Sequence, residues 1–171
     1  VVYCHSKANC EHIAWELSCP YYHADVIDRA DTLQQWLASD GGLIVATSAL
    51  GTGVDFPGIV FILHVGMPWS AIDFAQESGR GGREGETVGS IVLADRLSVR
   101  RTLEQKPDDV NVQAMGDFLL ATGCRRAQLS EFLDGRAIEC SELESAANCD
   151  RCGEGVAECQ NKQATTSREW Q

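Results

Sequence analysis

The residues of this chain with the clearest chemistry are two arginines, Arg80 and Arg83, in the stretch QESGRGGREG at 76–85. A guanidinium stays protonated in proteins, and its fork of N–H donors matches the oxygens of a phosphate. Three residues apart at the end of an expected helix, the two side chains would project the same way. Glycines around them let the backbone approach a partner closely. In isolation such a pair is more often a glycine turn with solvated arginines, so its meaning depends on the rest of the chain.

The eight cysteines form a second group of residues that could do chemistry. Cys4, Cys10 and Cys19 lie among apolar residues, where buried free thiols are typical. The other five crowd the last third of the chain, at Cys124, Cys140, Cys149, Cys152 and Cys159. With no secretory signal among these residues, clustered cysteines favour a metal site over disulfides.

The charge balance limits how this chain could meet nucleic acid. Fourteen basic and 25 acidic residues give a net charge of −11, which argues against nonspecific attraction to a polyanion. DNA contacts would have to come from local clusters, namely Arg80/Arg83, Arg96/Arg100/Arg101 and Arg125/Arg126. No apolar run approaches the roughly 18 residues that a membrane span needs, so no membrane partner is expected.

The apolar pattern predicts the elements that position these groups. Strands are expected at 1–4, 21–23, 43–47, 59–65 and 87–94. Helices are expected after a cap at Ser6, around Leu33–Leu37, and from a cap at Ser70 to about Ser78. Continuous apolar strands separated by helices predict a parallel α/β sheet covered on both faces. Ligands of such sheets bind outside the carboxyl ends of the strands.

The strand pattern ends after about Leu103. Helices are expected at 110–122, at 125–133 and over Glu139–Ala147, followed by a tight cysteine turn at 148–152. Residues 153–171 are polar without periodicity and are expected to be poorly ordered. The strand character of the first residues predicts that the chain is a segment of a larger protein or the product of an open-ended gene model.

Several segments together resemble a known family. They are VVYCHSKANCEHIA at the start, YYHAD at 21–25, LIVATSALGTGVDFPGIVFILHV at 43–65 and QESGRGGREG. In order and spacing they resemble the second RecA-like lobe of superfamily 2 helicases, and most closely RecQ-type DNA helicases. CRRAQLSEFLDG at 124–135 and NCDRC at 148–152 resemble the zinc module of that family. The resemblance covers residues 1–152 and implies a RecA-like parallel sheet flanked by helices at 1–103 and a small helical zinc-binding subdomain at 104–152, which leaves the tail at 153–171.

The resemblance also implies roles for single residues. Arg83 matches the finger that reaches the γ-phosphate of ATP bound on the other lobe, and Arg80 is turned towards the nucleotide and the lobe interface. Gln76, Gly53 and Asp55 match nucleotide or interlobe positions. Ser6, Lys7, Thr47 and Ser48 match positions near the DNA backbone. Without that context Asp55 could be a turn residue, and Thr47 and Ser48 a solvated strand end. His23 and His64 are expected to be core histidines.

For the metal, the resemblance and the C-x-x-C spacing both indicate zinc. Cys149 and Cys152 can bind one tetrahedral ion, and two distant cysteines complete a closed site. The expected ligands are Cys124, Cys140, Cys149 and Cys152. Eight residues separate Cys140 from Cys149, more than in the family, so Cys159 is an alternative to Cys140.

The implied function is the C-terminal part of an ATP-dependent DNA helicase of 3′-to-5′ polarity. Its partners would be single-stranded or duplex-junction DNA, ATP with Mg²⁺, and a first RecA-like lobe that binds most of the nucleotide. No G-x-x-x-x-G-K-[ST] loop occurs in this sequence, so the chain alone is expected to be inactive. In a eukaryote it would be nuclear, and otherwise it would lie in the cytoplasm or nucleoid. The alternative is a truncated relative acting as a zinc-stabilised interaction or DNA-binding module without activity. The cysteine module argues against an RNA helicase or translocase.

Overall fold

The computed structural model describes residues 1–39, 42–51, 56–144 and 146–153. The chain divides into two compact units, Val1–Gly116 and Asp117–Gln171. The functional boundaries at 103 and 152 stay predictions. Gly53, Asp55, Cys159 and the expected tail beyond Gly153 lie outside the described residues. Among the helices that the structure describes, none has the length and apolarity that crossing a membrane requires.

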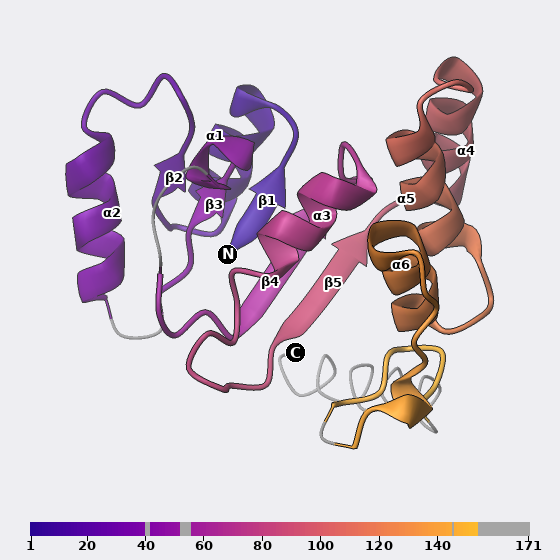
Figure 1. The fold of residues 1–171 in the computed structure, drawn as a ribbon. Helices are drawn as coiled ribbons and strands as arrows, with labels where there is room; N and C mark the ends of the chain where they lie inside the picture. The colour runs from indigo at the N-terminus through magenta and orange to yellow at the C-terminus, as the bar shows by residue number, and fades with distance from the viewer. Residues whose placement is uncertain (40–41, 52–55, 145, 154–171) are drawn as a thin grey trace, which may run out of the picture. The chain divides into compact units, whose positions relative to one another are not determined.

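The first unit is built on a parallel sheet of five strands in the order β2-β3-β1-β4-β5 (Figure 1). The strands are β1 (Val2–Cys4), β2 (Tyr21–Tyr22), β3 (Val45–Ala46), β4 (Phe61–Val65) and β5 (Gly89–Leu93). Every strand expected from the sequence is present, although each is shorter than its apolar run. The predicted α/β class with a parallel sheet flanked by helices is confirmed.

The helices of the first unit begin at side-chain caps. They are α1 (Lys7–Glu16), α2 (Arg29–Ala38), the 3₁₀ turn η1 (Ser48–Gly51), α3 (Ala71–Ser78), α4 (Arg96–Gln105) and α5 (Val110–Leu120), which ends in the second unit. As predicted, Ser6 Oγ accepts from the Asn9 amide at the start of α1, and Ser70 Oγ accepts from the Asp73 amide at the start of α3.

The two sides of the central strands carry separate cores because side chains alternate across a strand. Val2 and Val45 pack with Cys10 and Ala14 of α1 on one face. The alternate residues of the same strands pack with Trp36 of α2 on the other. The expected cover on both faces therefore holds for β1 and β3. It is wrong for β5, an edge strand whose residues Ile91 and Leu93 remain 43% and 64% exposed.

The described part of the second unit contains α6 (Arg125–Asp134) and the 3₁₀ turn η2 (Cys140–Glu142). Helix α6 ends at Gly135, whose φ of 70° only glycine adopts without strain. The helix expected over Glu139–Ala147 is wrong. Glu139 and Glu142 close a capping box on a single turn, and Leu143 then takes extended backbone angles that end it.

Candidate nucleotide, nucleic-acid and metal sites

The arginine loop, residues Gly79–Gly85, follows the end of α3 and lies at the amino ends of two strands. The Gly82 amide donates to the Ile59 carbonyl at 3.1 Å, and the Gly89 amide donates to the Val60 carbonyl at 2.9 Å. Ile59 and Val60 directly precede β4. Ligands of parallel sheets usually bind at the carboxyl ends of the strands. Because the arginine loop lies at the amino ends, that rule does not predict its position.

The two arginines occupy different environments in the loop. Because α3 ends at Ser78, helical spacing does not set their directions as expected, and Gly82 with a φ of 72° stands between them. Arg80 is half-buried, whereas Arg83 is exposed. Burial raises the pKa of the Tyr3 hydroxyl, the Glu77 carboxylate acts in the same direction, and the Arg80 guanidinium opposes both. Arg80 thus lies within electrostatic reach of the strand β1, and Arg83 is the more exposed of the two arginines.

A buried hydrogen bond between β4 and α3 supports the helix that leads into this loop. His64 Nε2 lies 2.9 Å from Glu77 Oε2, and both residues are buried. The His64 ring also contacts Tyr3 and Phe74. The prediction of a core histidine is confirmed here, and also for His23, which is bonded at 2.9 Å to a glutamate. Sequence reasoning missed Glu77, although its position three residues after the apolar Phe74 places it on the buried face of α3.

The residues matched to the DNA path gather at the opposite, carboxyl end of the sheet. Ser6 and Lys7 follow β1, and Thr47 and Ser48 follow the neighbouring parallel strand β3. Ser6, Lys7 and Ser48 are exposed, while Thr47 is half-buried and its amide donates to the Tyr22 carbonyl. The structure brings these four residues to one edge, where hydroxyls and an ammonium suit phosphate oxygens.

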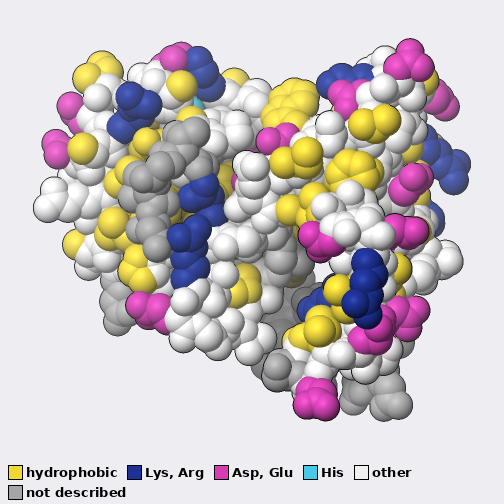
Figure 2. Space-filling view, in the orientation of Figure 1, with side chains coloured by type: hydrophobic (Ala, Val, Ile, Leu, Met, Phe, Trp, Pro, Cys, Tyr) yellow, Lys and Arg dark blue, Asp and Glu magenta, His cyan; other side chains and the backbone are white. Residues whose placement is uncertain are grey.

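The charge at this edge is modest. The Lys7 ammonium pairs with the exposed Asp25 carboxylate, which lowers the pKa of that carboxyl through the hydrogen bond and the charge of Lys7. Figure 2 shows lysine and arginine side chains in small separate groups among acidic and apolar ones. Such a surface suits local phosphate contacts better than broad electrostatic attraction.

The second unit holds a cluster of four cysteines. The sulfurs of Cys124, Cys140, Cys149 and Cys152 all lie within 4.8 Å of one another, and those of Cys124 and Cys140 are 3.7 Å apart. A tetrahedral zinc with bonds of about 2.3 Å sets its ligand sulfurs about 3.8 Å apart. All four cysteines are free of disulfides. The donor set and spacing fit zinc, and Cys140 belongs to the cluster despite the long spacer.

Backbone amides favour the ionised thiol that a metal needs at Cys149 and Cys124, whereas burial raises the pKa of Cys140 and hydrogen bonds with neighbouring thiols raise that of Cys152. Burial opposes ionisation of Cys149, but amides of Arg125, Arg151 and Cys152 outweigh it and hold the pKa of this thiol at about 6. The Arg125 amide lies 3.4 Å from the Cys149 sulfur. Local hydrogen bonds likewise lower the pKa of Cys124 against the effect of burial.

Two arginines considered as a DNA cluster brace the cysteine turn instead. Arg125 forms a two-pronged pair with Asp150, with Nε–Oδ1 at 3.0 Å and Nη2–Oδ2 at 3.2 Å. Arg126 donates to the Ala147 carbonyl at 3.3 Å. The bonds join the start of α6 to the turn that holds Cys149 and Cys152, so this part of the cluster has a structural role.

Comparison with known proteins gives these sites a context. Residues 1–85 match the helicase conserved C-terminal domain. The putative ATP-dependent DNA helicase Q1 of Caenorhabditis elegans is 32% identical over 96% of this chain. The RecQ-like DNA helicase blm-1 of the same organism is 31% identical over 89% of this chain. This chain carries the C-terminal lobe of a RecQ-like helicase. The chain spans only 28% and 17% of the length of these two relatives.

A solved structure agrees on the fold of the RecQ-like lobe. The Escherichia coli DEAD-box protein SrmB, crystallised with the regulator of ribonuclease activity A, superposes with a TM-score of 0.53. The match covers 61% of this chain and 67% of that chain at 18% identity. At this identity the likeness concerns the fold alone, and it agrees with the parallel sheet flanked by helices described above.

Proposed function

We propose that this RecQ-like lobe supplies Arg83 as the finger that completes an ATP site on a separate first lobe. The observation that carries the proposal is that Arg83 is exposed on a turn anchored to β4 through the Gly82–Ile59 bond. Phosphoryl transfer is catalysed mainly by positioning and charge, and a fixed guanidinium supplies both. In this proposal the first lobe binds Mg²⁺ and most of the ATP, while Arg80, Gln76, Gly53 and Asp55 add contacts at the lobe interface.

The DNA path of the proposal runs over the carboxyl ends of β1 and β3. There, Ser6, Lys7, Thr47 and Ser48 contact phosphates of a single strand. The segment 47–59 has these hydroxyls at one end and the Ile59 carbonyl, which accepts from the arginine loop, at the other. Closure of the two lobes on ATP would therefore act on both ends of this segment, so that hydrolysis can step the lobe along DNA with the 3′-to-5′ polarity implied by the resemblance.

The zinc part of the proposal assigns Cys124, Cys140, Cys149 and Cys152 as the ligands of one structural Zn²⁺. A closed site of four thiolates leaves no open position for a substrate, so the ion would stabilise the second unit and take no part in hydrolysis. Arg125 holds the turn in place through Asp150, as supporting residues around metal ligands commonly do.

The decisive experiment mixes the full chain with a matching first lobe and measures DNA-stimulated ATP hydrolysis. Removing an arginine finger costs about 10³- to 10⁵-fold in rate, so Arg83→Ala should abolish hydrolysis at unchanged stability. Arg29→Ala, which removes an exposed arginine of α2 outside the candidate DNA clusters, is the matched control and should keep the rate. Hydrolysis that survives Arg83→Ala would contradict the assigned role.

The second candidate function is a zinc-stabilised interaction or DNA-binding module without activity. The net charge of −11 and the pairing of Lys7 with Asp25 favour the interaction form of this module, because both weaken attraction to phosphates. The same mixture separates the two candidates. A module of this kind would leave the hydrolysis rate of the first lobe unchanged at every ratio of the two proteins.

A further inference from the structure

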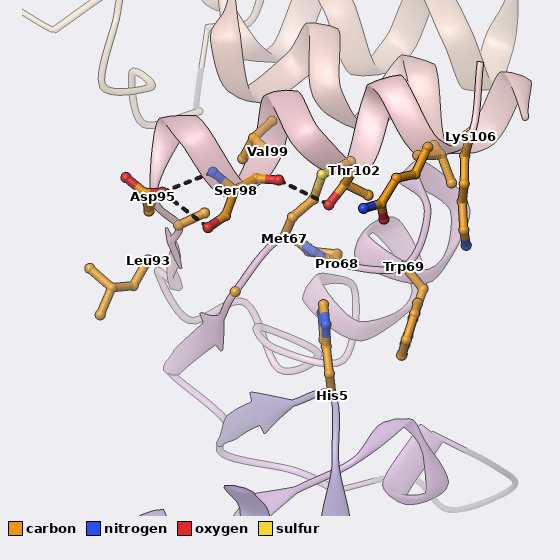
Figure 3. A pocket seen from close by; sticks show the side chains of 14 residues that line it. His5, Met67, Pro68, Trp69, Leu93, Asp95, Ser98, Val99, Thr102 and Lys106 are labelled. Atoms are coloured by element: carbon orange, nitrogen blue, oxygen red, sulfur yellow. Dashed lines mark hydrogen bonds between the residues drawn. The ribbon is translucent and has the colours of Figure 1, made fainter.

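A cavity of about 370 Å³ opens at the carboxyl ends of β1, β4 and β5, within the first unit. One side is formed by His5 and Trp69, and the other by residues of α4 and by Lys106 (Figure 3). Met67, Val99 and Val112 supply apolar side chains to its wall. Its volume and its mix of aromatic, apolar and few polar groups are typical of a small-ligand site. None of the roles assigned above uses it.

Trp69 provides an aromatic platform at this cavity. The indole is 52% exposed, and the His5 ring stacks on it with centroids 4.6 Å apart and planes 21° from parallel. Burial lowers the pKa of His5, so the stacked ring is mainly neutral at pH 7. Stacked rings form a rigid flat surface, because the partner ring restricts rotation of the indole.

A cation stands over the same ring. The Lys106 ammonium lies 5.6 Å from the Trp69 ring centroid, and Figure 3 shows it on the side of the indole away from His5. This exposed cation–π contact is weaker than stacking of a base on an aromatic ring. A flat ligand can therefore displace the Lys106 ammonium and stack on the face of the Trp69 indole. The flexible lysine side chain can then pair with a negative charge on the same ligand.

The cavity adjoins the proposed DNA path. His5 directly precedes Ser6, and a smaller recess is lined jointly by His5, Trp69 and Ser48. A strand whose phosphates lie on Ser6 and Ser48 would thus pass beside the indole. Platforms that combine aromatic rings with neighbouring cations are the usual means of holding single-stranded nucleic acid without reading its sequence.

We propose that this cavity holds one unstacked nucleobase of a single DNA strand, stacked on Trp69, with its phosphate on Lys106. The inference rests on the proposed DNA path and adds a base contact to a path otherwise made of backbone contacts. The carboxylate of Asp95 and the hydroxyls of Ser98 and Thr102 on the facing helix also line this cavity. Because stacking accepts any base, the site would grip the strand without sequence preference.

The test compares two probes of equal length and charge, a ten-residue oligothymidylate and the same backbone without bases. Each is titrated into the full chain while the tryptophan indole N–H resonances and the affinity are followed by NMR. The Trp69 resonance should shift with the oligothymidylate alone, which should bind about 10-fold more tightly than the abasic strand. Trp69→Leu should remove that preference, and Trp69→Phe should keep most of it.

The matched control is Trp15→Leu, which removes an indole that is 74% exposed on α1 and should change neither affinity. Thermal unfolding of Trp69→Leu checks that the variant is folded. Equal binding of the two probes by the unaltered chain, or a preference that survives Trp69→Leu, overturns the base site and leaves the backbone path standing. Failure of the unaltered chain to bind either probe overturns both the base site and the proposed DNA path.

Discussion

The Gly82 amide donates to the Ile59 carbonyl at 3.1 Å, which ties the arginine loop to the residue before β4. Ile59 ends the segment that begins with Thr47, whose own amide is bonded to Tyr22 beside β3. The chain between the two candidate sites is thus held by backbone hydrogen bonds at both ends. These hydrogen bonds fix the position of the loop that carries Arg83, so the sheet determines where the charge of this arginine stands.

Gly82→Ala should destabilise the chain and displace the loop. Residue 82 has a φ of 72°, and an added Cβ would lie 2.9 Å from the Glu86 carbonyl oxygen. The left-handed backbone costs a non-glycine residue about 1–2 kcal/mol, and the clash with backbone adds to that cost. Urea unfolding measures the loss of stability, and hydrolysis with a first lobe measures the displacement of Arg83.

Gly85→Ala is the control for this glycine. Its φ of 92° imposes similar strain, but an added Cβ would meet nothing within 4 Å. The Gly85→Ala variant should lose less stability than Gly82→Ala, and the rate of ATP hydrolysis measured with a first lobe should stay unchanged. Equal losses for the two variants would show that backbone strain alone, and not the close approach to Glu86, restricts residue 82.

Glu77→Ala should destabilise the first unit by about 1–3 kcal/mol, because it leaves the buried His64 Nε2 without a partner. Glu77→Gln keeps a hydrogen-bonding group and should lose less. The control is Glu11→Ala, since Glu11 bonds His23 at the same 2.9 Å but is 53% exposed. Water can replace that carboxylate, so the control should cost less than about 1 kcal/mol. A larger loss at Glu11 than at Glu77 would refute this account.

The sequence allowed the sheet to be predicted because strands buried on both faces are continuous apolar runs, as in residues 1–4 and 43–47. Helix α4 escaped prediction because charged residues surround Val99, the one residue of this helix that is buried. The topology of the sheet also predicts at which end of the strands the arginine loop lies. Helix α3 leaves the carboxyl end of β4 and must return the chain to the amino end of the parallel strand β5.

The sites divide in the same way. Ser6 and Ser48 could be placed together, since each follows a parallel strand and such carboxyl ends share one edge. The contact of His5 with Trp69 and Lys106 could not, because it joins three distant segments whose side-chain directions depend on packing. The approach of Cys140 to Cys149 was also open, because it depends on η2 and on the bonds of Arg125 and Arg126 to Asp150 and Ala147, not on a local pattern.

Ser6→Asp should weaken DNA binding without loss of stability. Aspartate caps a helix as well as serine does, so the bond from the Asn9 amide is retained. Its charge would stand where a phosphate is proposed, and two like charges about 4 Å apart in water cost about 1 kcal/mol, roughly five-fold in affinity. Ser6→Asn caps without a charge and serves as the control. Equal DNA affinities of the two variants, measured by fluorescence anisotropy, would place the phosphate elsewhere.

Cys140→Ser should abolish zinc binding by the full chain, whereas Cys159→Ser should not. The Cys140 sulfur is buried and lies 3.7 Å from that of Cys124, and serine is a poor ligand where a soft thiolate is lost. Native mass spectrometry should find one zinc in the unaltered chain and in Cys159→Ser, and none in Cys140→Ser. Because metal binding contributes directly to folding of such modules, chelation should also lower the thermal unfolding midpoint of the unaltered chain. Zinc retained by Cys140→Ser and lost by Cys159→Ser would reassign the fourth ligand.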